Sequence, residues 1–454
     1  MNSVAIVGGG ITGLTAAYHL HQKNIPVTVY ESSARAGGMI QTLESAGFLA
    51  EQGPNTILET NASVSELVCH LGLTSRRMYP SPGAEARYVV RDGKPVRLPE
   101  SAMEAVRTPL LSTRAKVRVL GDLFIGRGTE PDETLSSFVT RRLGCELLDY
   151  LIDPFVGGVY AGDPDRLSVH HAFPKLEALE HRYRSLIGGT VLGARERRKR
   201  HEVSRTKARM LTFDRGLGVL VSALQSSLGD CIQLETAVTG IWRRRPGWRV
   251  DTAAGTTEHS AVILCAPAHQ VARLYMENGA KEEQDVLREV YYPPLARVAL
   301  GFRSEQITHA LDGFGILIPQ KENMHCLGIL FSSSMFPNRA PAGHALLTAY
   351  IGGSRHGEMV HTTDDNLVEM VLADLETVLG VSGAPVFQNV IRIIRSIPQY
   401  NVGYGEVKDT INRMEAESPG LFIAGNYRDG VSVADCIQGG VGACGKAMDY
   451  LRHA

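Results

Sequence analysis

Apolar and polar positions near the start of the chain follow the order strand, glycine turn, helix, strand. The stretch SVAIVGGGITGLTAAYHLHQKNIPVTVYES (3–32) opens with a buried apolar run, continues with helical spacing and ends with a second apolar run. This order is that of a βαβ unit, which belongs to a parallel sheet covered by helices. We therefore expect an α/β fold.

Two later regions interrupt this pattern in different ways. Residues 88 to about 205 contain stretches such as SAMEAVRTPLLSTRAKVRVLGDLF, in which apolar residues recur at three and four positions, so we expect a mostly helical insertion. Residues 290–395 hold β-type runs such as RVALGF, HCLGILFSS and ALLTAYIGG, with one helix around 364–380. This second region is expected to form a sheet over a pocket, which adds mixed α+β insertions to the α/β fold.

Composition excludes some classes of partner and site. The 454 residues carry a net charge of −1, so no nucleic acid partner is expected. Residues 195–209 (RERRKRHEVSRTKAR) are strongly basic, and they are either a solvated loop or a surface for a membrane or a phosphate. No C-x-x-C pair occurs among the seven cysteines, so we expect neither a disulfide framework nor a metal site.

The ends and hydropathy of the chain bear on its location. A strand that begins within a few residues of Met1 leaves no room for a cleaved targeting peptide, and no apolar run reaches the ~18 residues that span a bilayer. We expect a cytoplasmic protein, and any membrane contact would be peripheral, on the inner face of the cell membrane. The oligomeric state stays open, a homodimer included.

A glycine pattern lies between the first strand and the first helix. Gly8, Gly10 and Gly13 form G-x-G-x-x-G: the first permits a tight turn, the second lets backbone approach a pyrophosphate, and the third lets the helix pack on the strand. The N–H groups at the start of the helix then face the phosphates. Glu31 follows 18 positions after Gly13, where a carboxylate can accept hydrogen bonds from a ribose diol. The pattern predicts a dinucleotide site.

The residues after Glu31 indicate which dinucleotide binds. Arg35, Gly37 and Gly38 resemble the R-x-G-G extension of flavin amine oxidases, and this favours FAD over NAD. Two distant segments support FAD: the one around Val238, where such flavoproteins pass the chain across the adenine, and residues 419–451, which read as strand, glycine turn and helix. The expected FAD contacts in these segments are Gly8, Gly9, Gly10, Ile11, Thr12, Gly13, Glu31, Ser32, Arg35, Gly37, Gly38, Met39, Val238, Gly425, Asn426, Val431, Ser432 and Val433.

These segments define a domain plan. The FAD-binding domain is expected to combine residues 1–87, 206–275 and 396–454. Residues 88–205 would form the helical subdomain, with a candidate membrane contact, and residues 276–395 the substrate-binding domain.

Residues 158–168 (GVYAGDPDRLS) stand between two helical patterns, and their glycines and Asp-Pro step predict a break there. With its flanks, PFVGGVYAGDPDRLSVHHAFPKLEALE, this stretch resembles a signature of protoporphyrinogen oxidases, especially of the plant-plastid type. Other stretches resemble blocks of that family in the same order: EQGPNTI (51–57), GFGILIP (313–319), LGILFSSSMFPNRAPAGHALLTAYIGG (327–353), SIPQYNVGY (396–404) and GLFIAGNYRDGVSVADCIQGG (420–440).

The resemblance implies an FAD oxidase of porphyrin biosynthesis that converts protoporphyrinogen IX to protoporphyrin IX, with oxygen as acceptor and hydrogen peroxide as product. Gly158 would be the catalytic position, because its carbonyl would lie near the pyrrole nitrogens. The resemblance also implies that Gly53, Pro54, Asn55 and Thr56 approach the flavin. The implied substrate contacts are Arg87 as the propionate clamp, Asn55, Gly315, Leu317, Leu330 and Tyr350.

Other functions stay open. Coproporphyrinogen III is oxidised by members of the same family, and its four propionates call for more cations around the pocket. A more distant alternative is a non-catalytic protein that binds flavin or porphyrin. An amine oxidase or carotene desaturase would share the amino-terminal motif but not the later blocks.

Overall fold

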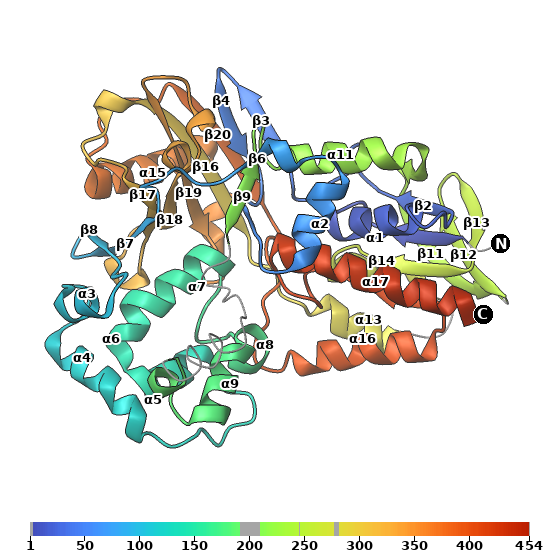
Figure 1. Ribbon diagram of the computed structural model, residues 1–454, viewed down its shortest axis with the longest axis horizontal. Helices are drawn as coiled ribbons and strands as arrows, with labels where there is room; N and C mark the ends of the chain where they lie inside the picture. Colours follow the sequence, from blue (N-terminus) through green and yellow to red (C-terminus); the bar gives the residue numbers. More distant parts are fainter. Residues whose placement is uncertain (1–2, 191–208, 245, 277–280, 454) are drawn as a thin grey trace.

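The computed structural model describes residues 3–190, 209–244, 246–276 and 281–453. Figure 1 shows two lobes, with a parallel sheet and its helices at one end and a larger sheet with a group of short helices at the other. The basic segment 195–209, apart from Arg209, lies outside the described residues. Within the described part of the chain, no helix is both long and apolar enough to cross a membrane.

The first lobe is built on a parallel sheet in the order β10–β2–β1–β14–β21. Both faces of this sheet are buried, because alternate residues of β1 pack into two separate apolar cores. Helices α1, α11 and α17 cover one face, which explains the continuous apolar runs of the strands. The elements are β1 (Val4–Val7), α1 (Ile11–His21), β2 (Val27–Tyr30), α11 (Gly218–Leu228), β10 (Ile232–Gln233), β14 (Ala261–Leu264), β21 (Leu421–Ile423) and α17 (Val433–His453).

A smaller sheet, in the order β13–β12–β11–β15, and two helices cover the other face. These elements are β11 (Val238–Arg244), β12 (Gly247–Thr252), β13 (Gly255–His259), β15 (Tyr275–Met276), α13 (Lys281–Arg288) and α16 (Gly405–Glu417).

The second lobe contains a mixed sheet in the order β20–β16–β19–β18–β17–β7–β8. Helix α15 (Asp364–Leu379) packs on one face through apolar residues, as the sequence predicts for residues 364–380. The other face meets β4 (Phe48–Glu51), where Phe48 and Ala50 pack on Ala299 and Leu346. The strands are β7 (Ala86–Arg91), β8 (Lys94–Arg97), β16 (Leu295–Arg303), β17 (Gly313–Leu317), β18 (Cys326–Phe331), β19 (His344–Gly352) and β20 (Phe387–Ile393).

The insertion after this sheet's first hairpin is helical, with an apolar core of its own. Its elements are α3 (Ala102–Arg107), α4 (Thr113–Leu120), η2 (Gly121–Phe124), α5 (Leu135–Leu143), α6 (Cys145–Leu147), η3 (Leu148–Ile152), α7 (Asp153–Tyr160), α8 (Val169–Ala172) and α9 (Pro174–Tyr183). The predicted boundary between residues 87 and 88 differs from the structure, because it falls inside β7. The hairpin β7–β8 pairs with β17 and so belongs to the mixed sheet of the second lobe.

The predicted break at residues 158–168 is wrong for its first residues. Helix α7 continues through Gly157 and Gly158 to Tyr160, and it ends only at Ala161, whose φ is +51°. Glycine lowers helix stability by roughly 1 kcal/mol relative to alanine, but the close packing of α7 on the sheet requires it. A methyl group at Gly158 would lie 2.3 Å from Leu317 Cδ2.

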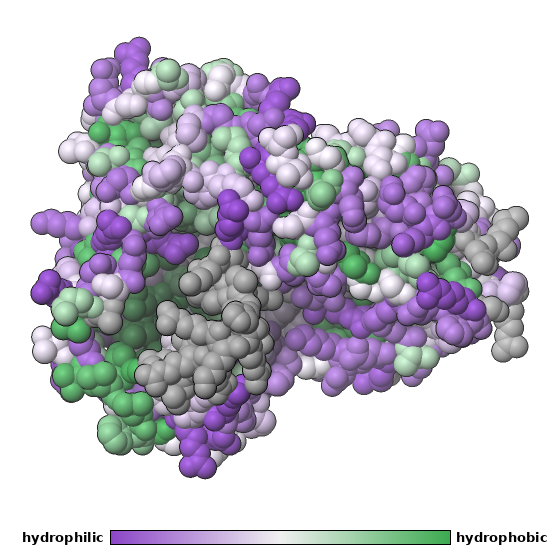
Figure 2. Space-filling model, in the orientation of Figure 1, coloured by the Kyte–Doolittle hydropathy of each residue, from purple (hydrophilic) through white to green (hydrophobic). Residues whose placement is uncertain are grey.

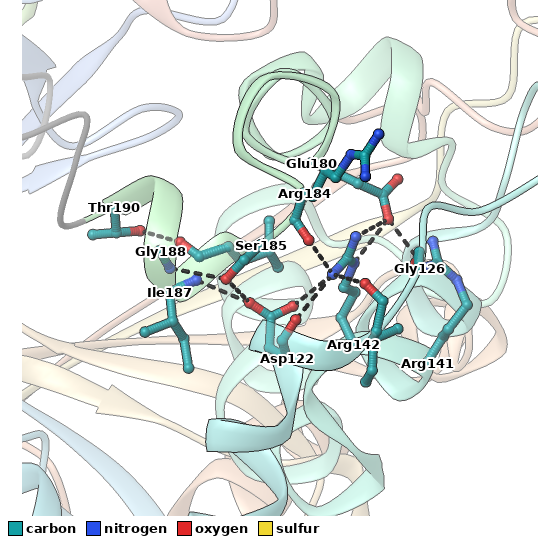
Figure 3. A network of polar contacts seen from close by, with 12 residues as sticks. Asp122, Gly126, Arg141, Arg142, Glu180, Arg184, Ser185, Ile187, Gly188 and Thr190 are labelled. Atoms are coloured by element: carbon teal, nitrogen blue, oxygen red, sulfur yellow. Dashed lines mark hydrogen bonds and ion pairs between the residues drawn. The ribbon is translucent and has the colours of Figure 1, made fainter.

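A buried ion-pair network holds the helical insertion together, as Figure 3 shows. The Arg142 side chain is fully buried, and it pairs with Asp122 at 3.0 Å and with Glu180 at 2.7 Å. Asp122 also accepts hydrogen bonds from Ser185 Oγ and from the Ile187 N–H. The network therefore joins η2, α5, α9 and the segment after α9.

Loss of the Arg142 charge should destabilise this insertion. Arg142→Met leaves the fully buried Asp122 carboxylate without a counter-ion, and breaking a buried pair on one side costs roughly 3–5 kcal/mol. Thermal unfolding and limited proteolysis should report an earlier transition of residues 113–190. Arg97→Met, which removes the exposed pair with Glu100, is the control and should unfold like the parent. Equal transitions for both variants would contradict this role.

Candidate functional site

The glycine turn between β1 and α1 is tightly packed at two positions. Gly8 has φ of +106°, and a methyl group on it would lie 2.8 Å from the Ala266 nitrogen. A methyl group on Gly13 would lie 2.0 Å from the Gly8 carbonyl oxygen, so the start of α1 can approach β1 only with glycine there. The Gly9 N–H donates to Glu31 Oε2 at 2.8 Å, which brings the predicted ribose-binding carboxylate to this turn.

Gly10, the second glycine of the G-x-G-x-x-G pattern, faces open space. Gly10 precedes α1 with φ of −71°, and no side chain caps the helix. A methyl group on Gly10 would meet no described atom within 4 Å. Open space before an uncapped helix N-terminus, whose first residues are Ile11 and Thr12, fits a phosphate group of FAD.

The R-x-G-G segment lies against this turn. The Gly37 N–H donates to the Gly9 carbonyl at 2.7 Å, and a methyl group on Gly38 would lie 3.2 Å from Gly10 Cα. Ser32, Arg35 and Met39 are exposed beside it. The R-x-G-G motif therefore lies beside the glycine turn, at the end of the parallel sheet where α1 begins.

The predicted flavin-facing segment Gly53–Thr56 follows β4 and is half-buried throughout. Gly53 packs on the R-x-G-G segment, because a methyl group there would lie 2.0 Å from the Met39 carbonyl oxygen. Pro54, Asn55 and Thr56 continue from this contact toward the second lobe. Glycine at position 53 thus has a packing role besides any cofactor contact.

Two further predicted segments reach the same end of the parallel sheet. The Thr236 N–H, two residues before Val238, donates to the Glu31 carbonyl at 2.8 Å. At the start of α17, Ser432 Oγ caps the helix by accepting from the Asp435 N–H. Helix α17 packs on α1 where Gly440 faces the Thr12 carbonyl. The loop before it contains Gly425, Asn426 and Val431, and Val433 is the first residue of the helix. The Asn426 carbonyl accepts a hydrogen bond from the Tyr400 hydroxyl.

Sheet register in the second lobe places the predicted substrate residues on one face. Arg87 pairs with Gly315 and Gly315 with Leu330, while Leu317 pairs with Gly328 and Gly328 with Tyr350. Paired residues share a face, and residues two apart along a strand do too. The intervening residues Tyr88, Ile316 and Ile329 face α15 instead.

Gly158 reaches this face from α7. It lies against Leu317, so the helix and the sheet wall meet there. The two N–H groups after the helix bond elsewhere, Ala161 to the Gly157 carbonyl and Gly162 to the Val156 carbonyl. The Gly158 carbonyl is therefore not used by either of them. Figure 2 shows an apolar hollow over α6 and α7, where Phe155 and Val159 are exposed.

Asn55 and Tyr350 connect the two lobes. Asn55 Nδ2 donates to the Tyr350 hydroxyl, so the phenol keeps its own proton for another acceptor. Burial raises the pKa of Tyr350, whereas the Arg297 charge and the Asn55 hydrogen bond act in the opposite direction. At neutral pH the phenol is therefore protonated and can donate.

The sequence did not indicate a buried ion pair beside Asn55. Glu51 at the end of β4 pairs with Arg339 at 3.0 Å, and both line a small cavity with Asn55. Burial raises the pKa of Glu51, while Arg339 lowers it. The signal available in the sequence was a charged residue directly after the apolar run FLA (48–50), and it could not identify the partner.

A family model matches nearly the whole chain. Residues 11–448 match the family model described as flavin containing amine oxidoreductase. The chain belongs to this family. This flavin-containing amine oxidoreductase therefore uses FAD, and the end of the parallel sheet where α1 begins is where its residues would hold the cofactor.

Curated relatives cover nearly the whole chain. Protoporphyrinogen oxidase 2 of Arabidopsis thaliana is 36% identical, with 99% of this chain and 94% of that protein covered. Coproporphyrinogen III oxidase of Bacillus subtilis is 31% identical, with 99% and 98% covered. Among solved structures, "Putative protoporphyrinogen oxidase from Exiguobacterium sp. 255-15" aligns with a TM-score of 0.83 at 26% identity over 99% of both chains.

A more distant structure shows how widely this oxidoreductase shares its fold. Reduced UDP-galactopyranose mutase aligns with a TM-score of 0.78 at 16% identity, over 99% of this chain and 96% of that one. At this identity only the fold is shared.

Proposed function

We propose that this FAD enzyme oxidises a porphyrinogen of haem biosynthesis, protoporphyrinogen IX to protoporphyrin IX, with oxygen as acceptor and hydrogen peroxide as product. The observation that carries the proposal is the shared face of Arg87, Leu317, Leu330 and Tyr350, with Gly158 packed on it. A flat apolar macrocycle with carboxylates needs such a wall with a cation at its edge. The full-length relatives named for porphyrinogen oxidation support the same reading.

The residues of this chain would bind and orient the substrate. When bound, FAD supplies the two-electron oxidation of the substrate's saturated carbons. Arg87 would pair with a propionate, and Leu317 and Leu330 would flank the ring. The Gly158 carbonyl would accept a hydrogen bond from the pyrrole N–H groups, which holds the macrocycle in one orientation.

Coproporphyrinogen III is the alternative substrate, because relatives named for it match as much of the chain. Parallel assays of both porphyrinogens under air, followed by porphyrin fluorescence and peroxide release, separate the two. We expect faster turnover of protoporphyrinogen IX. A yellow protein that releases peroxide with neither compound would overturn the proposed function.

Arg87→Ala should weaken substrate binding much more than FAD binding. Arg87 is exposed on β7, the strand next to the edge strand β8, and its guanidinium lies 5.7 Å from the centre of the Phe314 ring. A hydrogen bond to a charged group contributes roughly 1.5–3 kcal/mol, so KM should rise about 10- to 150-fold. Lys94→Ala, in the same hairpin, is the control for general effects. An unchanged KM would remove Arg87 from the site.

The helical insertion is also proposed to touch a membrane surface. Apolar side chains of α3, α4 and η2 are exposed, and Phe124 is 89% exposed. Figure 2 shows them gathered at the lower left of the molecule. Arg107, Arg114 and Arg127 are exposed in the same region, which suits anionic headgroups. The apolar residues are Met103, Val106, Val117, Leu120, Leu123 and Phe124.

Vesicle flotation tests this contact. The parent should float with vesicles that contain anionic lipid, and Leu120→Glu with Phe124→Glu should weaken binding roughly tenfold, because two apolar side chains lose their burial. Val386→Glu, exposed just before β20 of the mixed sheet and outside the helical insertion, should bind like the parent. Equal flotation of all three proteins would exclude this surface. A homodimer stays a prediction that analytical ultracentrifugation can check.

A further inference from the structure

A charged residue lies inside the apolar run of β16. Arg297 occurs in LARVALGF, and its exposed fraction is 0%. Arginine stays protonated inside proteins, and burial of a charge is costly unless an opposite charge and hydrogen bonds accompany it. The buried Arg297 guanidinium is therefore expected to have an opposite charge and hydrogen-bond acceptors beside it.

The hydrogen bonds of Arg297 are incomplete. Its Nη2 donates to Asn389 Oδ1 at 2.9 Å, and Gln52 Nε2 donates to the same oxygen at 3.1 Å. Among the described residues, neither Nε nor Nη1 of Arg297 has a hydrogen-bond partner. Both nitrogens are buried, so the chain itself leaves two donors of a cation unsatisfied.

No carboxylate of the described residues forms an ion pair with Arg297. The acid that acts on its charge is Glu51, and Glu51 is already occupied by Arg339 at 3.0 Å, Thr42 Oγ1 at 2.7 Å and the Leu217 N–H at 2.9 Å. Arg142, which is also fully buried among the described residues, differs because it has two carboxylates. Arg297 is thus a buried cation without a counter-ion of its own.

Sheet register shows where this cation faces. Arg297 pairs with Tyr350 across β16 and β19, and the row continues through Gly328 to Leu317. Paired residues share a face, so Arg297 lies on the same face as the proposed substrate contacts. Gln52, which shares the Asn389 oxygen with Arg297, and Asn55, which bonds Tyr350, flank the Gly53–Pro54 segment that is expected to approach the flavin.

We propose that Arg297 is a second anion-binding residue of the site, and that its counter-ion is a negative charge brought by the bound flavin or by a substrate carboxylate. Four strand spacings of about 4.8 Å separate β16 from β7, so Arg297 lies roughly 19 Å across the sheet from Arg87. The two arginines would therefore not hold the same carboxylate. The flavin is the first source to test, because of the Gly53–Pro54 segment.

Arg297→Met and Arg297→Lys test the proposal in the full-length protein with FAD. If the flavin is the source, Arg297→Met should weaken binding of the reduced cofactor relative to the oxidised cofactor by tenfold or more. Weaker binding of the reduced cofactor lowers the two-electron potential of the flavin by about 30 mV per tenfold change in relative affinity. Arg297→Lys should restore most of the lost potential. Dye-linked potentiometry without substrate measures this shift.

Porphyrin titrations test the other source. If a carboxylate pairs with Arg297, Arg297→Met should lower the affinity for coproporphyrin, with four carboxylates, by tenfold or more, and leave the potential unchanged. Protoporphyrin, whose two carboxylates lie at one edge, serves as the comparison ligand. This arm rests on the proposed function, whereas the potentiometric arm does not. A protein that oxidises no porphyrinogen but shows the potential shift would refute only the proposed function.

The ligand-free protein provides a separate check. Because the unpaired charge opposes folding without a ligand, Arg297→Met should leave the melting temperature of the FAD-free protein equal or higher. A melting temperature that falls would show that Arg297 stabilises the fold itself. That result, or unchanged potential and porphyrin affinities in Arg297→Met, would overturn the proposal.

Discussion

Gly158→Val is expected to retain FAD and lose roughly 100-fold or more in turnover. The added Cβ would lie 2.3 Å from Leu317 Cδ2, so Leu317 or α7 must move where the macrocycle would bind. Misplacement of a bound substrate by about 1 Å can reduce turnover by this factor. Steady-state turnover and the flavin absorbance of the same preparation provide the two measurements.

Gly157→Ala is the matched control one residue earlier in α7. A methyl group there would lie 3.6 Å from Leu327 Cδ2, which is an ordinary contact, and alanine favours the helix. This variant should turn over like the parent. Full activity of Gly158→Val would show that neither its small size nor its carbonyl position matters to the reaction.

Gly10→Val should fold but bind FAD weakly. The backbone at Gly10 has φ of −71°, which valine adopts, and its Cβ would meet no described atom within 4 Å. The side chain would instead occupy the space before α1 that fits a phosphate. Overpacking costs roughly 1–3 kcal/mol, which corresponds to about a 5- to 150-fold higher Kd for FAD. Fluorescence titration of the FAD-free protein measures it.

The control separates cofactor loss from misfolding. Gly126→Val lies in the helical insertion, where a methyl group also meets nothing within 4 Å, and it should bind FAD normally. Circular dichroism of Gly10→Val should match the parent. Normal FAD affinity in Gly10→Val would place the phosphates elsewhere.

Several features depended on neighbours that are close in the sequence, and these could be predicted. The spacing of Gly8, Gly10 and Gly13 can be interpreted from the adjacent strand and helix alone. The helix at 364–380 follows from apolar periodicity alone, and α15 (Asp364–Leu379) lies there. Local sterics and periodic burial determine such features, because they do not depend on which distant segment packs against them.

Other predictions failed because the deciding contact is distant. Residues 88–97 were assigned to the helical insertion, yet β7 and β8 join the sheet through pairing with β17, more than 200 residues later. Gly158 was expected to break a helix, but α7 includes it because the sheet lies so close. Local propensity contributes about 1 kcal/mol per glycine, which tertiary packing can outweigh.

By itself, the sequence determined the α/β class, the glycine turn of the FAD site and the family resemblance, because motifs of short range specify them. Only the tertiary structure decided which side chains share the face of the mixed sheet that we propose for the substrate. Strand register placed Arg87, Leu317, Tyr350 and Arg297 on one face of the mixed sheet. The tertiary structure also revealed that Arg297 is buried without a counter-ion, since burial and pairing depend on every segment that surrounds a charge.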